Sequence, residues 1–225
     1  MLCVVCREKI KTNIDAHVDL HLSIRQDQIL EYFKNLAAPF KVRLYPVTGA
    51  DVQRREVLFS MENAKLFIGY AERHHQIPWQ ECCEWMAFHE KAHIRLSDLY
   101  SRPGINPHIV SNVEDYYIEQ YMMLKKYRRV YEANAKLILE IRKMMQLPMT
   151  INLANIDSRI YYYLTYACWY ASEVASLTEV NLTQPELKII ETVAGVIKGL
   201  KTPEGLSPTI SRINVLLACL IGSHA

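Results

Sequence analysis

The chain has 225 residues, of which 50% are apolar, and its formal net charge is +2. This length and apolar content suffice for one packed domain with a small appendage, or for two modest domains. The small net charge does not predict strong nonspecific attraction to nucleic acid or to anionic lipid. No apolar run approaches the about eighteen residues of a membrane span, and the N-terminus has no basic head followed by an apolar core. We therefore expect a soluble, cytoplasmic protein that is not exported and has no membrane partner.

The chain begins with a two-cysteine, two-histidine pattern. Cys3 and Cys6 are separated by two residues, and His17 and His21 follow with three residues between them. This spacing is typical of small structural zinc sites. So short a segment cannot bury enough apolar surface to fold alone, so zinc would supply its folding energy. We predict a zinc finger over residues 1–24.

Short elements of both kinds are predicted next. Residues 26–38 have apolar side chains at helical spacing, and residues 41–47 alternate like a half-buried strand. Residues 56–60 and 65–70 are further short strand candidates on either side of a predicted turn at 61–64. A small sheet is expected here.

The rest of the chain is predicted to be helical. A helix begins at Pro78 and ends before a loop rich in glycine and proline at about 101–107. Another starts at Asn106-Pro107 and runs to about 129, and further helices are predicted at about 131–146, 155–178, 185–200 and 208–221. The fold class is therefore α+β and mostly helical, with a domain over 25–225 whose helical C-terminal subdomain spans about 130–225.

The helix that begins at Pro78 carries the motif His89-Glu90-x-x-His93. Residues four apart lie on one face of a helix, so both imidazoles can reach a single point. They share the apolar face of the helix, and burying two unpartnered imidazoles would cost about 1–3 kcal/mol each, whereas one zinc ion satisfies both. Glu90 is turned about 100° from His89, too far round to be the natural third ligand but able to reach a metal-bound water as a general base. The pattern predicts a catalytic metal site.

A third ligand is expected on the next helix. Glu114 falls among apolar residues on the helical wheel, and a carboxylate in such a place is costly unless it is paired or bound to a metal, so it is the first candidate. Asp115 is the next candidate, since Glu119, one turn later, could then orient a ligating histidine. Glu119 is the remaining candidate for the third ligand, but on its own it is expected on a solvated face.

The motif, the twenty intervening residues and Glu114 together resemble the gluzincin metallopeptidases. The resemblance covers about residues 40–125 and implies a zincin-like core, in which a small sheet lies above an active-site helix. It also implies a zinc-dependent peptidase. One departure is Ile118, where gluzincins commonly place an acid four residues after the ligand, and this leaves the third ligand open.

The first segment resembles a second family. Residues 14–22 are similar to the helix of the ubiquitin-binding zinc fingers, with His21 in place of a cysteine and Asp15 in place of an asparagine. Asp19 matches the acidic residue with which those fingers touch ubiquitin. The resemblance implies a ubiquitin-like protein partner, while a DNA partner or a purely structural role for the finger remain alternatives.

These patterns lead to one main hypothesis. We expect a zinc metallopeptidase that holds one catalytic and one structural zinc ion, hydrolyses peptide bonds and uses Glu90 as its base. The first alternative is a noncatalytic, zincin-like binding or regulatory protein whose finger recruits a protein or DNA partner. A further alternative is metal-assisted hydrolysis of a non-peptide substrate.

Overall fold

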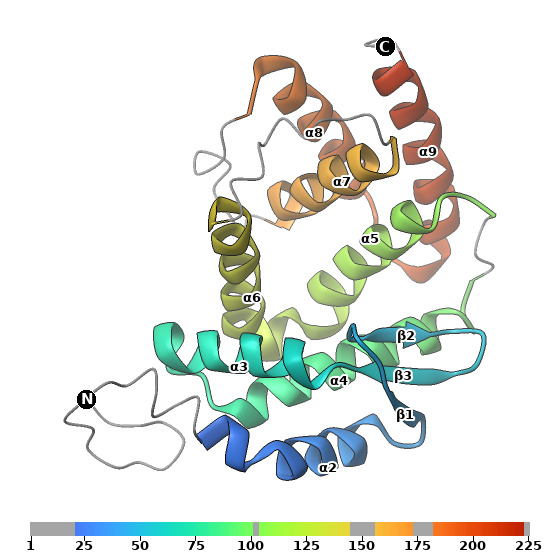
Figure 1. The fold of residues 1–225 in the computed structure, drawn as a ribbon. Helices are drawn as coiled ribbons and strands as arrows, with labels where there is room; N and C mark the ends of the chain where they lie inside the picture. The colour runs from blue at the N-terminus through green and yellow to red at the C-terminus, as the bar shows by residue number, and fades with distance from the viewer. Residues whose placement is uncertain (1–20, 101–103, 145–155, 173–181, 223–225) are drawn as a thin grey trace. The chain divides into compact units, whose positions relative to one another are not determined.

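The computed structural model describes residues 21–100, 104–144, 156–172 and 182–222. The chain divides into two compact units, the first made of residues 1–95 and 123–137 and the second of residues 96–122 and 138–225. The described part is mostly helical and contains one three-stranded sheet (Figure 1). This confirms the predicted mostly helical α+β class. Within the described residues, no helix is both long and apolar enough to cross a membrane.

The first unit combines the sheet with helices. Its elements are α2 (Gln26–Ala37), β1 (Lys41–Leu44), β2 (Gly49–Asp51), β3 (Glu56–Phe59), α3 (Met61–His75), α4 (Trp79–Leu96) and the first part of α6 (Leu124–Met144). The strand order is β1-β3-β2, with β1 parallel and β2 antiparallel to β3. Val57 at the centre of β3 lies opposite Val42 of β1 and Ala50 of β2.

Two predictions in this region were wrong. Residues 65–70 were expected to be a strand and residues 61–64 a turn, but both belong to helix α3. The Ser60 side chain caps this helix by accepting the N–H of Asn63. Ala64, Phe67 and Ile68 are then buried at helical spacing. A short apolar run cannot by itself distinguish a strand from a buried helix, and the cap at Ser60 is the signal that decides it.

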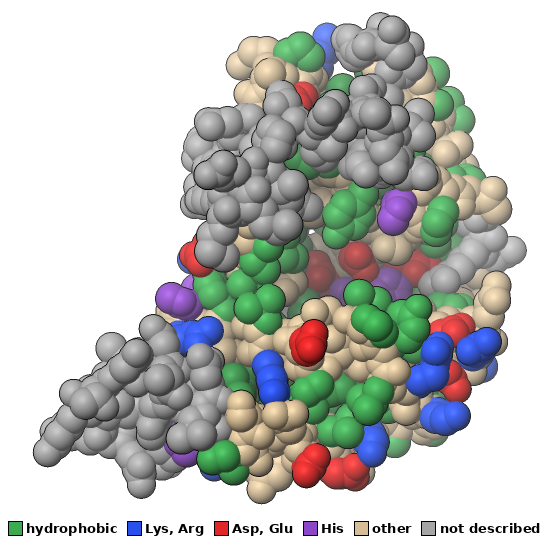
Figure 2. All heavy atoms as spheres, viewed as in Figure 1, with side chains coloured by type: hydrophobic (Ala, Val, Ile, Leu, Met, Phe, Trp, Pro, Cys, Tyr) green, Lys and Arg blue, Asp and Glu red, His purple; other side chains and the backbone are tan. Residues whose placement is uncertain are grey.

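Apolar and charged contacts hold the sheet in place. The ring centroids of Phe33 on α2 and Phe59 on β3 are 4.2 Å apart, and both side chains are fully buried. Arg43 on β1 donates from Nε to Glu56 at 2.9 Å and from Nη2 to Asp51 at 3.3 Å, which ties all three strands together. Figure 2 shows basic and acidic side chains close together on this part of the surface.

The second unit is helical in its described part. It contains α5 (Pro107–Tyr117), most of the π-helix η1 (Ile118–Met123), the end of α6, α7 (Ile156–Ser172), α8 (Gln184–Ile197), η3 (Pro203–Gly205) and α9 (Leu206–Gly222). Thr183 and Glu186 form a capping box at the start of α8. Four aromatic side chains of α7 belong to the core, whereas two others are exposed. The buried four are Tyr162, Tyr163, Tyr166 and Trp169, and the exposed two are Tyr161 and Tyr170. The predicted helical C-terminal half is confirmed for these residues.

The carboxylate of Glu84 ties α4 to two neighbouring helices of the first unit. It accepts hydrogen bonds from Tyr32 on α2 at 3.2 Å and from Tyr127 and Lys126 on α6 at 2.9 and 2.8 Å. The Lys126 ammonium also lies over the ring of Phe88 on α4, 5.5 Å from its centroid. The Lys126 hydrogen bond holds the pKa of Glu84 below its usual value.

Glu84→Ala is expected to lower the free energy of unfolding by about 1–3 kcal/mol, because three donors lose a charged acceptor. Since the pKa of Glu84 is lowered in the folded state, this contribution is present above the unfolded carboxyl pKa and disappears as the pH falls through the folded value. Urea unfolding at neutral and acidic pH measures both effects. Glu31→Ala, which breaks the exposed pair with Lys34, is the control and should cost less. Equal losses for the two variants would contradict the role of Glu84.

Glu72 is a buried acid on α3, with 3% of its surface exposed. Burial raises the pKa of Glu72 to about 7, although the Trp79 backbone N–H and the positive charges of Arg25 and Arg73 oppose this effect. The folded protein therefore holds a proton on Glu72 at a pH where the unfolded chain has lost it. Stability should fall as the pH rises from about 4.5 through about 7.

Glu72→Gln is expected to raise the free energy of unfolding at about pH 8 by on the order of 2 kcal/mol. At about pH 4 it should change little, because glutamine resembles the protonated acid that the wild type already carries. Denaturant unfolding across this range measures the difference. Glu62→Gln, an exposed change in the first turn of the same helix, should bring no gain at high pH. A gain that does not depend on pH would refute the titration of Glu72.

Candidate metal centre

Helix α4 carries the His-Glu-x-x-His motif, as predicted. The backbone N–H groups of Glu81 and Cys82 bond to the carbonyl of Pro78, which starts the helix. Lys91, only 7% exposed, donates from Nζ to the carbonyls of Leu36 and Ala38 at 2.7 and 2.6 Å, at the C-terminal end of α2. Lys91 and Glu84, seven residues apart and therefore on one face of α4, thus fix the orientation of this helix within its own unit.

The two histidines lie on the buried face of α4. His89 is 9% exposed and His93 is 8% exposed, which confirms the predicted apolar face. Their Nε2 atoms are 3.3 Å apart and their ring centroids 5.0 Å apart. Two nitrogen ligands at roughly 2.0–2.1 Å from a tetrahedral zinc ion are about 3.4 Å from each other. The observed separation therefore suits two imidazoles that share one ion, and it also suits a hydrogen bond between one N–H and one lone pair.

Aromatic side chains support the histidine pair. The indole ring of Trp85, one turn before His89, lies 5.4 Å from the His89 ring between centroids. Phe67 on α3 packs against Trp85 with a centroid distance of 5.5 Å. This packing restricts the His89 side chain to few orientations and surrounds it with apolar groups.

Helix α5 carries the two acids that the sequence offers as a third ligand. Pro107 is at its first position, and the Asn106 side chain accepts the N–H of His108 at 2.9 Å. Glu114 is 1% exposed, so its predicted inward direction is confirmed. The hydroxyl of Tyr100 donates a hydrogen bond to the Glu114 carboxylate, which gives this buried acid a neutral partner.

A group of three residues in the described part of the chain offers ligands that suit a metal ion: His89 and His93 on α4 of the first unit and Asp115 on α5 of the second. The acid of this group is the second sequence candidate, next to Glu114. Two imidazoles and one carboxylate form a ligand set that zinc accepts in hydrolases with one coordination position left for water, and that Fe(II) accepts in facial triads.

The π-helix η1, which begins at Ile118 directly after α5, was not predicted from the sequence. Glu119 lies in its first turn and is 9% exposed, so the expected solvated face for Glu119 was wrong. Asn112 on α5 is also buried: its amide donates to the His108 carbonyl at 2.8 Å and its oxygen accepts from Thr165. A π-turn adds a residue to the helical repeat, so a regular wheel drawn from α5 misplaces Glu119.

The predicted zinc finger lies almost wholly outside the described residues. Cys3, Cys6 and His17 are among residues 1–20, and only His21 is described, in a helical turn where its carbonyl accepts the N–H of Arg25. The finger and its structural zinc therefore remain predictions from the sequence.

The ligand assignment can be tested with a pair of neighbouring variants. Asp115→Asn is expected to lower the affinity of the α4 site for zinc by at least roughly tenfold, since the amide is a poor ligand. Glu114→Gln should retain the ion, because its amide oxygen still accepts the Tyr100 hydroxyl. Zinc per chain and competition with a chelator measure the loss, and Co²⁺ spectra separate this thiolate-free site from a cysteine-containing finger. The reverse result would make Glu114 the ligand.

No protein-family model, curated protein or solved structure matches this chain.

Proposed function

We propose that this chain is a metal-dependent hydrolase that cleaves peptide bonds, with its active site at the motif of α4. The observation that carries the proposal is the convergence of the two buried imidazoles, with Nε2 atoms 3.3 Å apart. Asp115 is the third ligand that we propose, because two imidazoles and one carboxylate form a set that zinc accepts. Zinc is the ion that we propose, since nitrogen and carboxylate ligands with one open position are its usual catalytic set.

The residues of the site divide into ligands and a base. His89, His93 and Asp115 would hold the ion, whose chemistry is to polarise a carbonyl group and to lower the pKa of a bound water to about 7. Glu90 follows His89 on the same helix and is partly exposed, so its carboxylate can meet solvent at the site. Its proposed role is to take the proton of the attacking water and to return it to the leaving amine.

The peptide substrate is inferred from the motif. The order His89-Glu90-x-x-His93 on one helix, followed by an acid on the next helix, is the arrangement that resembles the gluzincin peptidases. Ester or amide hydrolysis of a non-peptide substrate would use the same groups. The test below therefore uses peptide and ester substrates side by side.

Glu90→Gln is expected to reduce peptide cleavage by roughly 10²–10⁴-fold while the zinc content stays unchanged, because it removes the base and leaves the ligands. Cleavage of an unfolded protein and of a quenched peptide library, with zinc analysis of the same samples, measures this. Glu81→Gln, in the first turn of α4, is the matched control and should keep activity.

Three outcomes would count against the peptidase. A wild-type protein without an ion at the α4 histidines contradicts the metal site itself. A wild type that holds the ion but cleaves neither peptides nor esters favours the noncatalytic binding role. Activity on esters alone replaces the peptidase by another hydrolase.

A further inference from the structure

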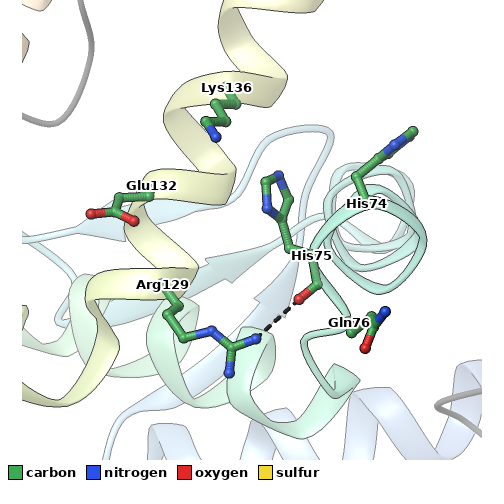
Figure 3. A pocket seen from close by; sticks show the side chains of 6 residues that line it. All are labelled: His74, His75, Gln76, Arg129, Glu132 and Lys136. Carbon is green, nitrogen blue, oxygen red and sulfur yellow. Dashed lines mark hydrogen bonds between the residues drawn. The ribbon is translucent and has the colours of Figure 1, made fainter.

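A second cluster of polar side chains lies in the first unit, at the end of α3. It lines a cavity of about 300 Å³ (Figure 3). We call it the basic pocket, and its lining residues are His74, His75 and Gln76 from the end of α3 and Arg129, Glu132 and Lys136 from α6. Its volume is at the lower end of the range for small-molecule sites. None of the six residues belongs to the proposed metal centre.

The basic pocket has an excess of positive charge. Its one carboxylate, that of Glu132, accepts a hydrogen bond from Nε of Arg128 at 2.8 Å. Arg129 and Lys136 are basic side chains, and neither forms an ion pair with an acid in the part of the chain that the structure describes. Two positive charges without an acidic partner among these residues therefore line one small cavity.

Arg129 is already held in position. Its Nη2 donates to the carbonyl of His75 at 3.0 Å, as Figure 3 shows. The C-terminal end of a helix carries partial negative charge, which would disfavour an anion. Here the Arg129 bond occupies the His75 carbonyl, and the N–H groups of Gln76 and Ile77 occupy the carbonyls of Glu72 and Ala71. A guanidinium has five N–H donors, so one bond to the helix leaves others for a ligand.

We propose that the basic pocket binds the phosphate group of a small phosphomonoester. At neutral pH such a group carries between one and a half and two negative charges, about as many as Arg129 and Lys136 can neutralise. Its three acceptor oxygens suit a guanidinium, an ammonium and the polar groups of His74, His75 and Gln76. A single carboxylate would neutralise only one of the two cations. A nucleic acid would need an extended basic surface, and the net charge of +2 does not favour one.

The experiment is a calorimetric titration of the full chain with three probes: inorganic phosphate, glycerol 3-phosphate and a short DNA duplex. Lys136→Gln should weaken binding of the two small probes by roughly tenfold or more, because it removes a charged donor. Lys136 is exposed and has no partner to lose among the described residues, so this variant should fold normally. Lys125→Gln removes an exposed charge of the same helix outside the pocket and should weaken binding less than about twofold.

Asp115→Asn separates this proposal from the metal site. That variant should bind glycerol 3-phosphate as the wild type does, because it alters only the proposed metal ligands. Saturable binding that depends on Lys136 and not on Lys125 supports the basic pocket. The absence of saturable binding, an equal effect of the two lysine variants, loss of binding in Asp115→Asn, or binding of the DNA duplex alone would each overturn it.

Discussion

Two imidazole nitrogens held 3.3 Å apart on the buried face of α4 are the constraint on which the proposed site depends. Two neutral imidazole nitrogens at this distance must share either a proton or a metal ion. Otherwise their lone pairs would face and repel each other, with little water in this buried place to bond to them. A rigid helix maintains the spacing without a contribution from loops, since residues four apart keep their separation as long as the helix is intact. The aromatic contact of Trp85 with His89 then limits the side-chain rotations that could relieve the constraint.

The residues that fix the position of α4 are different from the histidines that form the proposed site. Glu84 and Lys91 form charge-assisted hydrogen bonds with partners on other helices. If α4 moved along its axis by one helical turn, these hydrogen bonds would be lost. His89 and His93 occupy a different part of the same helix surface. A change at Glu84 would therefore act on the metal site through the position of α4 and not through direct contact with the ion.

Local patterns predicted most of the described fold. Helices α2 and α4, strands β1 and β3 and the start of α5 follow from apolar spacing, from Pro78 and Pro107, and from the Asn106 cap. The failures have three physical causes. The run at 65–70 is apolar enough for either a strand or a helix, and the cap at Ser60 is what distinguishes the two. The three-residue strand β2 is too short to show a period. The π-turn at Ile118 depends on hydrogen bonds that residue types do not encode, which is why the position of Glu119 could not be foreseen.

The adjacent acids of α5 show why burial alone cannot identify a ligand. Glu114 is the more buried of the two, and from the sequence this made it the first candidate, because a buried carboxylate needs compensation. Tyr100 provides that compensation with a hydroxyl, and a hydrogen-bonded acid no longer requires a metal. Asp115 is turned about 100° from Glu114 on the helix, and it is the acid that we propose as the ligand. For Glu114 the hydroxyl donor comes from fourteen residues earlier in the chain, beyond the reach of any helical wheel.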